Sequence, residues 1–598
     1  MTNPLQRRAE LFGIRASYHG ISGELFHPPH EALTSLLTAF GIPIEGTDPE
    51  ARPPELYAPE GVRCFLPESD ARMWGVAVQL YQLRSARNWG IGDFQDLAEL
   101  AQLCGDAGAD FIGLNPLHAL FLAVPQQCSP FSPSNRRFLN PLYIAVDRVP
   151  GFTTPPDLTA VRDADLVDYA GVTEVKMAAL RDIWARGVDD PEGFSRFMVE
   201  GGELLRRHAL FEALSLHFGP IHGAGWQGWP EEWRDVESPA VARFAAENAS
   251  EVEFHIWLQW LADRQLAEVR DACHAAGMRI GLYLDFAVGE SPGGSGTWSD
   301  PGLVVSGARI GASPDWFNAA GQDWGLAPLS PVELAARHAA PFQSLMQDAT
   351  HRAGALRLDH AMSLWQLFLI PDGMTAPQGT YVRYPVQEMI AALAQASNEN
   401  RTIIIGEDLG NVPDGFREVM AAANILSYRI LLFERHYDGF ISPEHYPREA
   451  LVCVSTHDLP TFQGWWRGDD VGLRLGFGFI SPESAEQQAG SRVHERRQLL
   501  GDLIRGGLLD PSASETPIDA APEELVIATH RHLARTPSRL LAVRLEDIAG
   551  EVAPVNVPST VDEYPNWRRK LSISLEDLPG TSLFRGITQA LAAERPRT

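Results

Sequence analysis

At 355–359 the chain reads Ala-Leu-Arg-Leu-Asp, at 403–408 Ile-Ile-Ile-Gly-Glu-Asp, and at 452–458 Val-Cys-Val-Ser-Thr-His-Asp. An apolar run of this kind is typical of a strand that is buried on both faces of a parallel sheet. The acid at its end then lies at the C-terminal edge, where α/β barrels and open α/β sheets carry their active sites. A single acid could equally cap the following helix. Three acids in successive units favour a shared site.

Five further apolar runs extend this pattern along the chain, and helical stretches separate the runs. Asp93 is a candidate helix cap, and Gly277 follows a helical stretch at 257–276 where a helix C-terminus favours glycine. Eight β/α units in series predict an α/β protein with a (β/α)₈ TIM barrel. The expected strands are Trp74–Tyr81, Phe111–Asn115, Arg279–Phe286, Ala355–Asp359, Thr402–Glu407, Ser427–Phe433, Leu451–His457 and Leu540–Glu546.

The spacing of these units predicts the domain organisation. Residues 1–70 form a small N-terminal unit with helices expected at Arg7–Leu11 and His30–Ala39. Residues 71–598 form the catalytic barrel. More than a hundred residues separate the second and third strands, so we expect an inserted subdomain at about 145–250.

The bulk composition excludes several classes of partner. The chain has 598 residues and a net charge of −28, which argues against nucleic acid and against an anionic membrane surface. A neutral substrate such as a sugar fits this charge. Five scattered cysteines indicate reduced thiols in a cytoplasmic protein, and the N-terminus lacks the apolar core of a signal peptide. No apolar run approaches the length of a membrane span.

The acids at the strand ends differ in their surroundings. Arg357 and Asp359 point the same way along a strand, so the guanidinium favours an ionised Asp359, as a nucleophile requires. The two could also form a purely structural ion pair. Glu407 follows a run of isoleucines, and an apolar setting raises a carboxyl pKa, as a general acid requires. His457 and Asp458 end the seventh run, where a third carboxylate could bind sugar hydroxyls. Two acids are the minimum for glycoside chemistry with a covalent intermediate.

Histidines accompany two of these acids. His360 and His457 are candidate substrate contacts, although each could simply be a hydrogen-bonded histidine at the barrel rim. The histidines do not form an i, i+4 pair with a third ligand, and the acids do not follow the pattern of a calcium loop. We therefore expect no metal and no cofactor.

Other polar and aromatic residues follow the expected strands. Asp285 ends the third strand, and Asn115 and His118 follow the second. Phe131 lies in a stiff Ser-Pro-Phe-Ser-Pro loop that is suited to lining a sugar site. Trp465 follows the seventh strand, where it could stack on a glucose ring or belong to the core.

A series of motifs runs from about residue 74 to 570, and their order identifies a family. They are Trp-Gly-Val-Ala-Val-Gln-Leu-Tyr (74–81), Asn-Trp-Gly-Ile-Gly-Asp-Phe (88–94), the segment 111–118, the Ser-Pro-Phe-Ser-Pro loop (129–133), the segment 281–289, Pro-Asp (314–315), Gly-Gln-Asp-Trp-Gly (321–325), the segments 356–360, 406–410 and 456–461, and Tyr-Pro-Asn-Trp-Arg-Arg-Lys (564–570). In these motifs the chain resembles the amylomaltases, bacterial 4-α-glucanotransferases related to the α-amylase clan.

The resemblance implies a role for each matching residue. Asp359 matches the nucleophile, Glu407 the acid/base and Asp458 the acid that stabilises the transition state. Arg357 and His457 match contacts of the nucleophile and of the sugar beside it. Asp315 and Trp324 match the loop over the acceptor groove.

Two positions depart from the family pattern. The family commonly has Tyr where Phe131 stands, which removes a hydroxyl and favours a stacking role. A Pro-Gly-Thr motif appears as Pro558-Ser559-Thr560, which leaves the backbone geometry of that loop open.

The resemblance implies transfer of α-1,4-glucan segments between maltooligosaccharides by a retaining double displacement. Two alternatives remain from the sequence: an α-glucan hydrolase, in which water replaces the sugar acceptor, and a glucan-binding protein without catalysis. The intact set of three acids argues against the second alternative. The oligomeric state and the preferred glucan length do not follow from the sequence.

Overall fold

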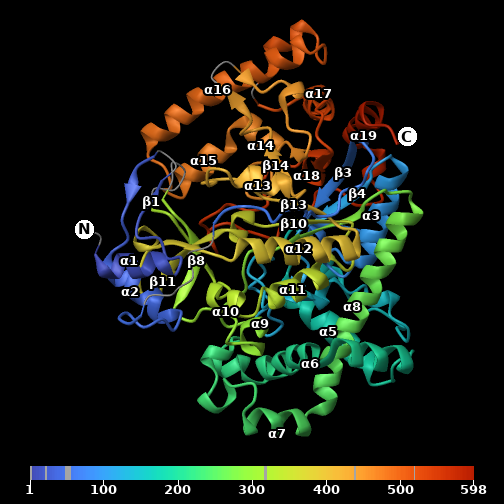
Figure 1. Cartoon of the computed structure of the whole chain (residues 1–598). Helices are drawn as coiled ribbons and strands as arrows, with labels where there is room; N and C mark the ends of the chain where they lie inside the picture. Colours follow the sequence, from blue (N-terminus) through green and yellow to red (C-terminus); the bar gives the residue numbers. More distant parts are fainter. Residues whose placement is uncertain are drawn as a thin grey trace.

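Eight parallel strands close into a barrel in the order in which they occur along the chain (Figure 1). The computed structural model describes residues 3–20, 23–47, 55–314, 320–436, 439–517 and 519–597. The predicted (β/α)₈ barrel is confirmed, and all eight expected strands are present. They are β3 (Met73–Val78), β4 (Phe111–Leu114), β7 (Gly281–Phe286), β10 (Ala355–Leu358), β13 (Ile403–Gly406), β14 (Leu426–Ile430), β17 (Ala450–Cys453) and β18 (Leu540–Arg544).

The strands that carry the acids are buried throughout. Every residue of β10, β13 and β17 is buried, which explains why each reads as a continuous apolar run. Every expected strand end except that of the third strand lies one to four residues too late, and the largest difference is in the seventh strand. The seventh strand ends at Cys453 and not at His457, because Ser455 Oγ donates to the carbonyl of Pro460 (2.6 Å) and turns the chain into a loop. Asp458 therefore lies on a loop and not at a strand end.

Helices cover the outside of the barrel. The Asp93 carboxylate caps α3 by accepting hydrogen bonds from the backbone N–H groups of Gln95 (3.0 Å) and Asp96 (3.1 Å). Gly277 follows α8 with a φ of 76°, as expected at a helix C-terminus. The longer helices after the strands are α3 (Phe94–Asp106), α8 (Ala249–Ala275), α11 (Ala340–Thr350), α12 (Val386–Asn400), α13 (Phe416–Ala422), α17 (Glu523–Ala534) and α19 (Ser582–Glu594).

A helical insertion separates β4 from α8 and occupies the lower part of Figure 1. Its long helix α6 is kinked at Gly202, whose φ of 54° is not helical. We propose the range 145–250 as the limits of this subdomain. Its helices are α4 (Thr159–Asp163), α5 (Tyr169–Trp184), α6 (Pro191–His222) and α7 (Pro239–Glu247).

A four-stranded antiparallel sheet, which the sequence did not predict, flanks the barrel. Its order is β12-β11-β8-β9, and the strands come from two segments that lie on either side of β10 in the sequence. Pairing between such distant segments leaves no local pattern. The strands are β8 (Ala308–Ala312), β9 (Gln322–Leu326), β11 (Gln366–Pro371) and β12 (Thr380–Arg383).

The N-terminal residues pack against this sheet (left side of Figure 1). Ile14 pairs with Val382 of β12, and Leu33 lies in the same apolar cluster as Leu356 of the barrel. The helix expected at His30–Ala39 has those bounds, whereas the first helix begins earlier, at Pro4. Residues 48–54, in a part of the chain rich in proline, lie outside the described residues. The elements are α1 (Pro4–Leu11), β1 (Tyr18–His19), β2 (Leu25–Phe26) and α2 (His30–Ala39).

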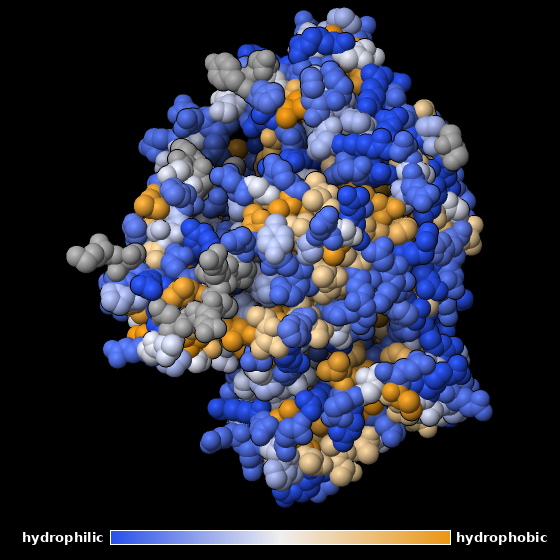
Figure 2. Space-filling view, viewed as in Figure 1, coloured by the Kyte–Doolittle hydropathy of each residue, from blue (hydrophilic) through white to orange (hydrophobic). Residues whose placement is uncertain are grey.

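The remaining elements lie in the segments that follow the barrel strands, and they include one long helix, α16. Figure 2 shows hydrophilic residues over most of one face, in keeping with the net charge of −28. Among the described helices, none has the length and apolar character that a membrane crossing needs. The elements are β5 (His118–Ala119), β6 (Asn135–Leu139), α9 (Ser295–Ser299), α10 (Pro331–Ala336), β15 (Arg435–His436), β16 (Gly439–Phe440), α14 (Phe462–Arg467), α15 (Asp469–Gly476), α16 (Pro482–Arg505) and α18 (Leu545–Ala549).

Candidate active site

An arginine and two acids join neighbouring strands at the C-terminal end of the barrel. Arg357 of β10 lies opposite Asp285 of β7 in the strand register. Its Nη1 donates to both carboxylate oxygens of Asp285 (2.8 and 2.9 Å), and its Nη2 lies 3.0 Å from Oδ1 of Asp359. The Asp359 side chain is 19% exposed, whereas those of Arg357 and Asp285 are buried. The guanidinium therefore holds the partly exposed Asp359 carboxylate with a positive charge against it.

Asp285 is held by the same arginine but has a different electrostatic setting. Burial raises the pKa of Asp285 to about 6, and the nearby Asp359 carboxylate acts in the same direction. The charge of Arg357 and its hydrogen bonds oppose this rise. We infer that Asp285 orients Arg357 and so keeps the second guanidinium nitrogen directed at Asp359.

Glu407 follows β13, the strand on the other side of β10. Its carboxylate accepts hydrogen bonds from the backbone N–H of His360 (2.9 Å) and of Leu409 (2.8 Å). Burial raises the pKa of Glu407 to about 7, although Arg357 and the two N–H donors act in the opposite direction. A carboxyl with a pKa near neutrality can hold a proton and also release it, as an acid/base group must.

Asp458 approaches the site from the loop after β17. Its Oδ2 lies 3.1 Å from Nε2 of His457, and its Oδ1 accepts a hydrogen bond from the Asn556 side chain (2.7 Å). The buried part of the carboxyl would raise its pKa, but His457 and the Asn556 hydrogen bond lower the pKa to about 2. The side chain is 47% exposed, so this carboxylate is ionised and accessible at neutral pH.

Three rings form a wall beside the acids. Phe131 stacks on His457 with ring centroids 4.5 Å apart, and Trp567 lies 5.5 Å from both rings. The guanidinium of Arg357 lies 6.0 Å from the Phe131 centroid. Trp567 has a φ of 60°, an uncommon value for a bulky residue, and its carbonyl accepts a hydrogen bond from Tyr169 (2.7 Å). The Ser-Pro-Phe-Ser-Pro loop therefore packs against His457, the residue before Asp458.

A second aromatic group lies on the side of the groove formed by β9. Trp324 packs edge-to-face on His360 at 5.3 Å. His360 has a φ of 46°, which places its backbone N–H against Glu407. Burial lowers the pKa of His360 to about 4 despite the adjacent Asp359, so the ring is neutral at pH 7. Asp315, expected on the same loop, lies outside the described residues.

Three expected contact residues lie apart from the acids in the described contacts. Asn115 is buried and links strand ends, with Oδ1 accepting from the N–H of Leu80 (2.8 Å). His118 is also buried and packs on Phe286, with ring centroids 5.4 Å apart. Burial is the main cause that lowers the pKa of His118 to about 3. Trp465 is 4% exposed and packs in a cluster with other aromatic rings, so its placement favours the core alternative.

The sequence did not single out two side chains that contact the His457–Asp458 pair. Asn556 binds Asp458, and Trp567 packs on His457. Trp567 lies in one of the family motifs, which was the available signal. Ser559, where the family has glycine, keeps a φ of 69°, so the left-handed geometry persists without a glycine.

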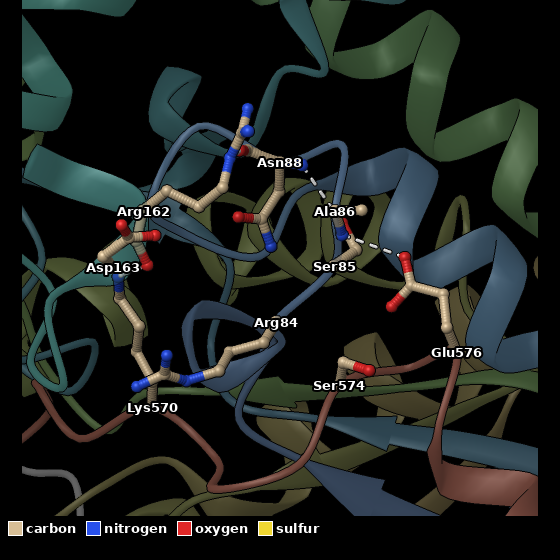
Figure 3. Close-up of a pocket in the computed structure, with 9 residues that line it drawn as sticks. All are labelled: Arg84, Ser85, Ala86, Asn88, Arg162, Asp163, Lys570, Ser574 and Glu576. Carbon is tan, nitrogen blue, oxygen red and sulfur yellow. Dashed lines mark hydrogen bonds between the residues drawn. The ribbon is translucent and has the colours of Figure 1, made fainter. Parts of the chain in front are cut away.

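A cavity of about 360 Å³ is lined by residues of the loop after β3, of α4 and of the segment 570–576, and by none of the three acids (Figure 3). Here Glu576 accepts a hydrogen bond from the N–H of Ala86 (2.9 Å), and Lys570 Nζ donates to the carbonyl of Val161 (2.7 Å). These bonds fasten the segment after Trp567 to the loop after β3 and to α4. The lining residues are Arg84, Ser85, Ala86, Asn88, Arg162, Asp163, Lys570, Ser574 and Glu576.

The parallel barrel and the acids at its C-terminal end define a class, the (β/α)₈ enzymes that carry carboxylates at strand ends. Residues 78–575 match the family model of glycoside hydrolase family 77, described as 4-alpha-glucanotransferase. The chain belongs to this family and is an enzyme of this type.

Individual relatives agree with this assignment. A 4-alpha-glucanotransferase of Haemophilus influenzae is 38% identical over 528 residues, which cover 84% of this chain and 76% of that protein. A 4-alpha-glucanotransferase of Mycobacterium bovis is 38% identical over 527 residues, covering 84% of this chain and 71% of that protein. The crystal structure of amylomaltase from Corynebacterium glutamicum superposes with a TM-score of 0.85 at 26% identity, covering 98% of this chain and 99% of that one.

Proposed function

We propose that this 4-alpha-glucanotransferase moves α-1,4-glucan segments between maltooligosaccharides by a retaining double displacement, with Asp359 and Glu407 as the reacting pair. The observation that carries the proposal is the different setting of the two carboxyls. Asp359 is partly exposed against a guanidinium, whereas Glu407 is buried with a pKa raised to about 7. Two carboxyls in such different environments can take the separate roles of nucleophile and general acid.

In the first step, Glu407 protonates the glycosidic oxygen while Asp359 attacks C1 from the opposite face of the sugar. The C1–O bond to the leaving glucan breaks, and the donor segment stays on Asp359 as a β-linked ester. In the second step, Glu407 takes the proton from the 4-hydroxyl of an acceptor glucan, which displaces Asp359. Two inversions give net retention, for which carboxyl separations of roughly 5–5.5 Å are typical.

Asp458 and the aromatic groups support these two steps. An ionised carboxylate beside the sugar stabilises the positive charge that develops at C1 in the transition state. Trp324, which packs on His360, and Phe131, which packs on His457, offer apolar ring surfaces that suit stacking with sugar rings. Transfer requires that an acceptor sugar displaces water from this groove, so we assign Trp324 to acceptor binding.

All five cysteines are buried and unpaired, which supports a reducing, cytoplasmic location. Together with the described helices, which include no membrane span, this supports a protein that meets its glucans in the cytoplasm.

The test is to incubate the purified protein with maltotriose and to follow oligosaccharide length and free glucose. We expect a ladder of longer maltodextrins plus glucose. In Asp359→Asn the rate at which these products form should fall by about 10³-fold or more. Production of maltose and glucose alone, with nothing longer than the starting trisaccharide, would instead establish a hydrolase. A ladder that persists undiminished in Asp359→Asn would overturn the assignment of the nucleophile.

A further inference from the structure

The loop that carries Asp458 is held by hydrogen bonds to a buried arginine, Arg544, on the neighbouring strand β18. Arg544 is the last residue of β18, which pairs with β17 in the barrel wall. Its Nη1 donates to the carbonyl of Thr456 (2.8 Å) and lies within 3.4 Å of acceptors on Ser455, Leu459 and Pro460. These acceptors lie on both sides of His457 and Asp458, so one guanidinium holds the two ends of the turn.

The positive charge of Arg544 is paired with a buried carboxylate that follows β18. Arg544 Nε lies 3.3 Å from Oε2 of Glu546, and their side chains are only 6% and 3% exposed. The next residue, Asp547, accepts a hydrogen bond from the N–H of Phe462 (2.8 Å), just beyond the loop. The strand β18 and the residues after it therefore contact the loop at its start and at its end.

The opposite side of the loop is held by a different contact. Asn556 donates to Oδ1 of Asp458, and His457 approaches Oδ2. The side chain of Asp458 is 47% exposed, so its position depends on these contacts and on the loop backbone. A guanidinium with several donors in a fixed plane defines a backbone position better than an ammonium, which is a flexible point charge.

We propose that Arg544 is a positioning residue for Asp458, and that it acts on the reaction only by fixing the loop 455–460. The proposal rests on the proposed role of Asp458 in the transfer reaction. Arg544 does not touch the sugar in this assignment. Its effect is therefore on the rate of the chemical step and not on binding of the ground-state glucan.

Arg544→Lys is the first variant, because it keeps the buried charge opposite Glu546 while it loses the planar set of donors. We expect kcat for disproportionation of maltotriose to fall by about 10- to 100-fold, the cost of a small displacement of a reacting group. KM should change by less than about threefold, since ground-state binding is retained. A kcat within twofold of the wild type in a folded Arg544→Lys protein would overturn the proposal.

Arg595→Lys is the matched control. Arg595 is also buried, and it donates to the carbonyls of Met73 (3.0 Å) and Ser538 (2.9 Å) at the opposite end of the barrel. Both substitutions should lower the melting temperature, but Arg595→Lys should leave kcat unchanged below that temperature. An equal loss of kcat in both variants would show a general loss of packing and would count against positioning.

The background Asp458→Asn separates this proposal from the proposed function. If Arg544 acts through Asp458, adding Arg544→Lys to Asp458→Asn should lower the residual rate by no more than about twofold, because the effects of coupled groups are not additive. Multiplicative losses would overturn the positioning role. An Asp458→Asn enzyme with full activity would instead overturn the role of Asp458 itself.

Ser455→Ala keeps the test decisive if Arg544→Lys does not fold. This change removes a hydroxyl that donates to the carbonyl of Pro460 and lies 3.3 Å from Arg544. We expect kcat to fall by about fivefold in the wild-type background, roughly the value of one hydrogen bond, and not to fall in the Asp458→Asn background. An unchanged kcat in the wild-type background would contradict the proposal.

Discussion

The backbone N–H of His360 donates a hydrogen bond to the carboxylate of Glu407, so the residue after the proposed nucleophile directly contacts the proposed acid. His360 achieves this with a φ of 46°. The turn after β10 and the end of β13 are thereby joined at the reacting groups. This bond favours the ionised carboxylate, while burial favours the neutral carboxyl, and the balance leaves the pKa of Glu407 at about 7.

The pH dependence of the rate should report this balance. Glu407 must be protonated to act as the acid, so kcat/KM should fall tenfold per pH unit above about pH 7. The measurement is the pH profile for maltotriose, compared with that for release of fluoride from α-maltosyl fluoride, whose leaving group needs no proton. If the rate of fluoride release falls in the same way above about pH 7, the loss of activity at high pH is caused by a group other than Glu407.

The stability of the fold should also depend on Glu407. The folded protein holds this proton more tightly than the unfolded chain, because the pKa is about 7 in the fold and 4.5 ordinarily. The resulting stabilisation is complete below pH 4.5 and is lost as the pH rises from 4.5 to 7. Gln cannot ionise, so the free energy of unfolding of Glu407→Gln relative to wild type should rise by about 3 kcal/mol between pH 4.5 and 8. Denaturant titrations at the two pH values measure this change. Glu60→Gln, the same substitution at an exposed position, is the control.

Arg357→Lys tests the bridge between the two aspartates. A lysine cannot bind both oxygens of Asp285 and also reach Asp359 in the same plane. We expect kcat/KM to fall by about 10²-fold, because the nucleophile loses its fixed position. Arg279→Lys is the control, since Arg279 makes a similar two-point contact with Asp110 (2.6 and 2.9 Å) near the other end of the strands. Equal losses in both variants would deny Arg357 a specific role.

Phe131 should contribute through its ring. Phe131→Tyr keeps the stack on His457 and restores the residue common in the family, so kcat/KM should stay within about threefold. Phe131→Ala removes the stack, worth about 0.5–1.5 kcal/mol, and should lower kcat/KM by up to about tenfold. Kinetics with maltotriose measure both variants. A larger loss for Tyr than for Ala would mean that this wall has no room for a hydroxyl.

Two tryptophans expected to bind sugar should behave differently. Trp465→Ala should destabilise the protein by about 3–5 kcal/mol, because the ring is buried in the core, while the folded fraction keeps its activity. Trp324→Ala should leave the melting temperature nearly unchanged and should increase glucose formation relative to longer products, because water then competes with the acceptor. Thermal unfolding and product analysis together decide this. The reverse pattern would return Trp465 to the glucan groove.

The barrel was predictable because most of its strand residues are apolar and buried, although β14 alternates buried and partly exposed residues. The antiparallel sheet was not, since β8 pairs with β11 across the intervening strand β10 and no local pattern records this pairing. The length of β17 was overestimated for a related reason. Val454 and Ser455 continue the apolar and extended pattern, but the hydrogen bond from Ser455 to Pro460 ends the strand.

Part of the candidate site was predictable because a strand end fixes where its last side chain lies. Asp285, Arg357 and Glu407 meet for this reason. Asn556 and Trp567 could not be placed, since loops bring them to the acids from nearly a hundred residues or more away. Trp465 shows the opposite limit, because position after a strand does not determine whether a ring faces the groove or the core.

The packing of the N-terminal segment has a consequence for synthesis on the ribosome. The carbonyl of Arg15 accepts a hydrogen bond from Thr380, 365 residues later in the chain. At about 5–20 residues per second, the first helices wait roughly 20–70 s for the strand that covers them. Leu33, Leu36 and Leu37 of α2 are fully buried in the finished protein, and until β11 is made they lack the packing that this strand provides. The nascent chain therefore exposes an apolar segment early in synthesis. Its folding depends on keeping this segment from associating with other chains before its partner strand is made.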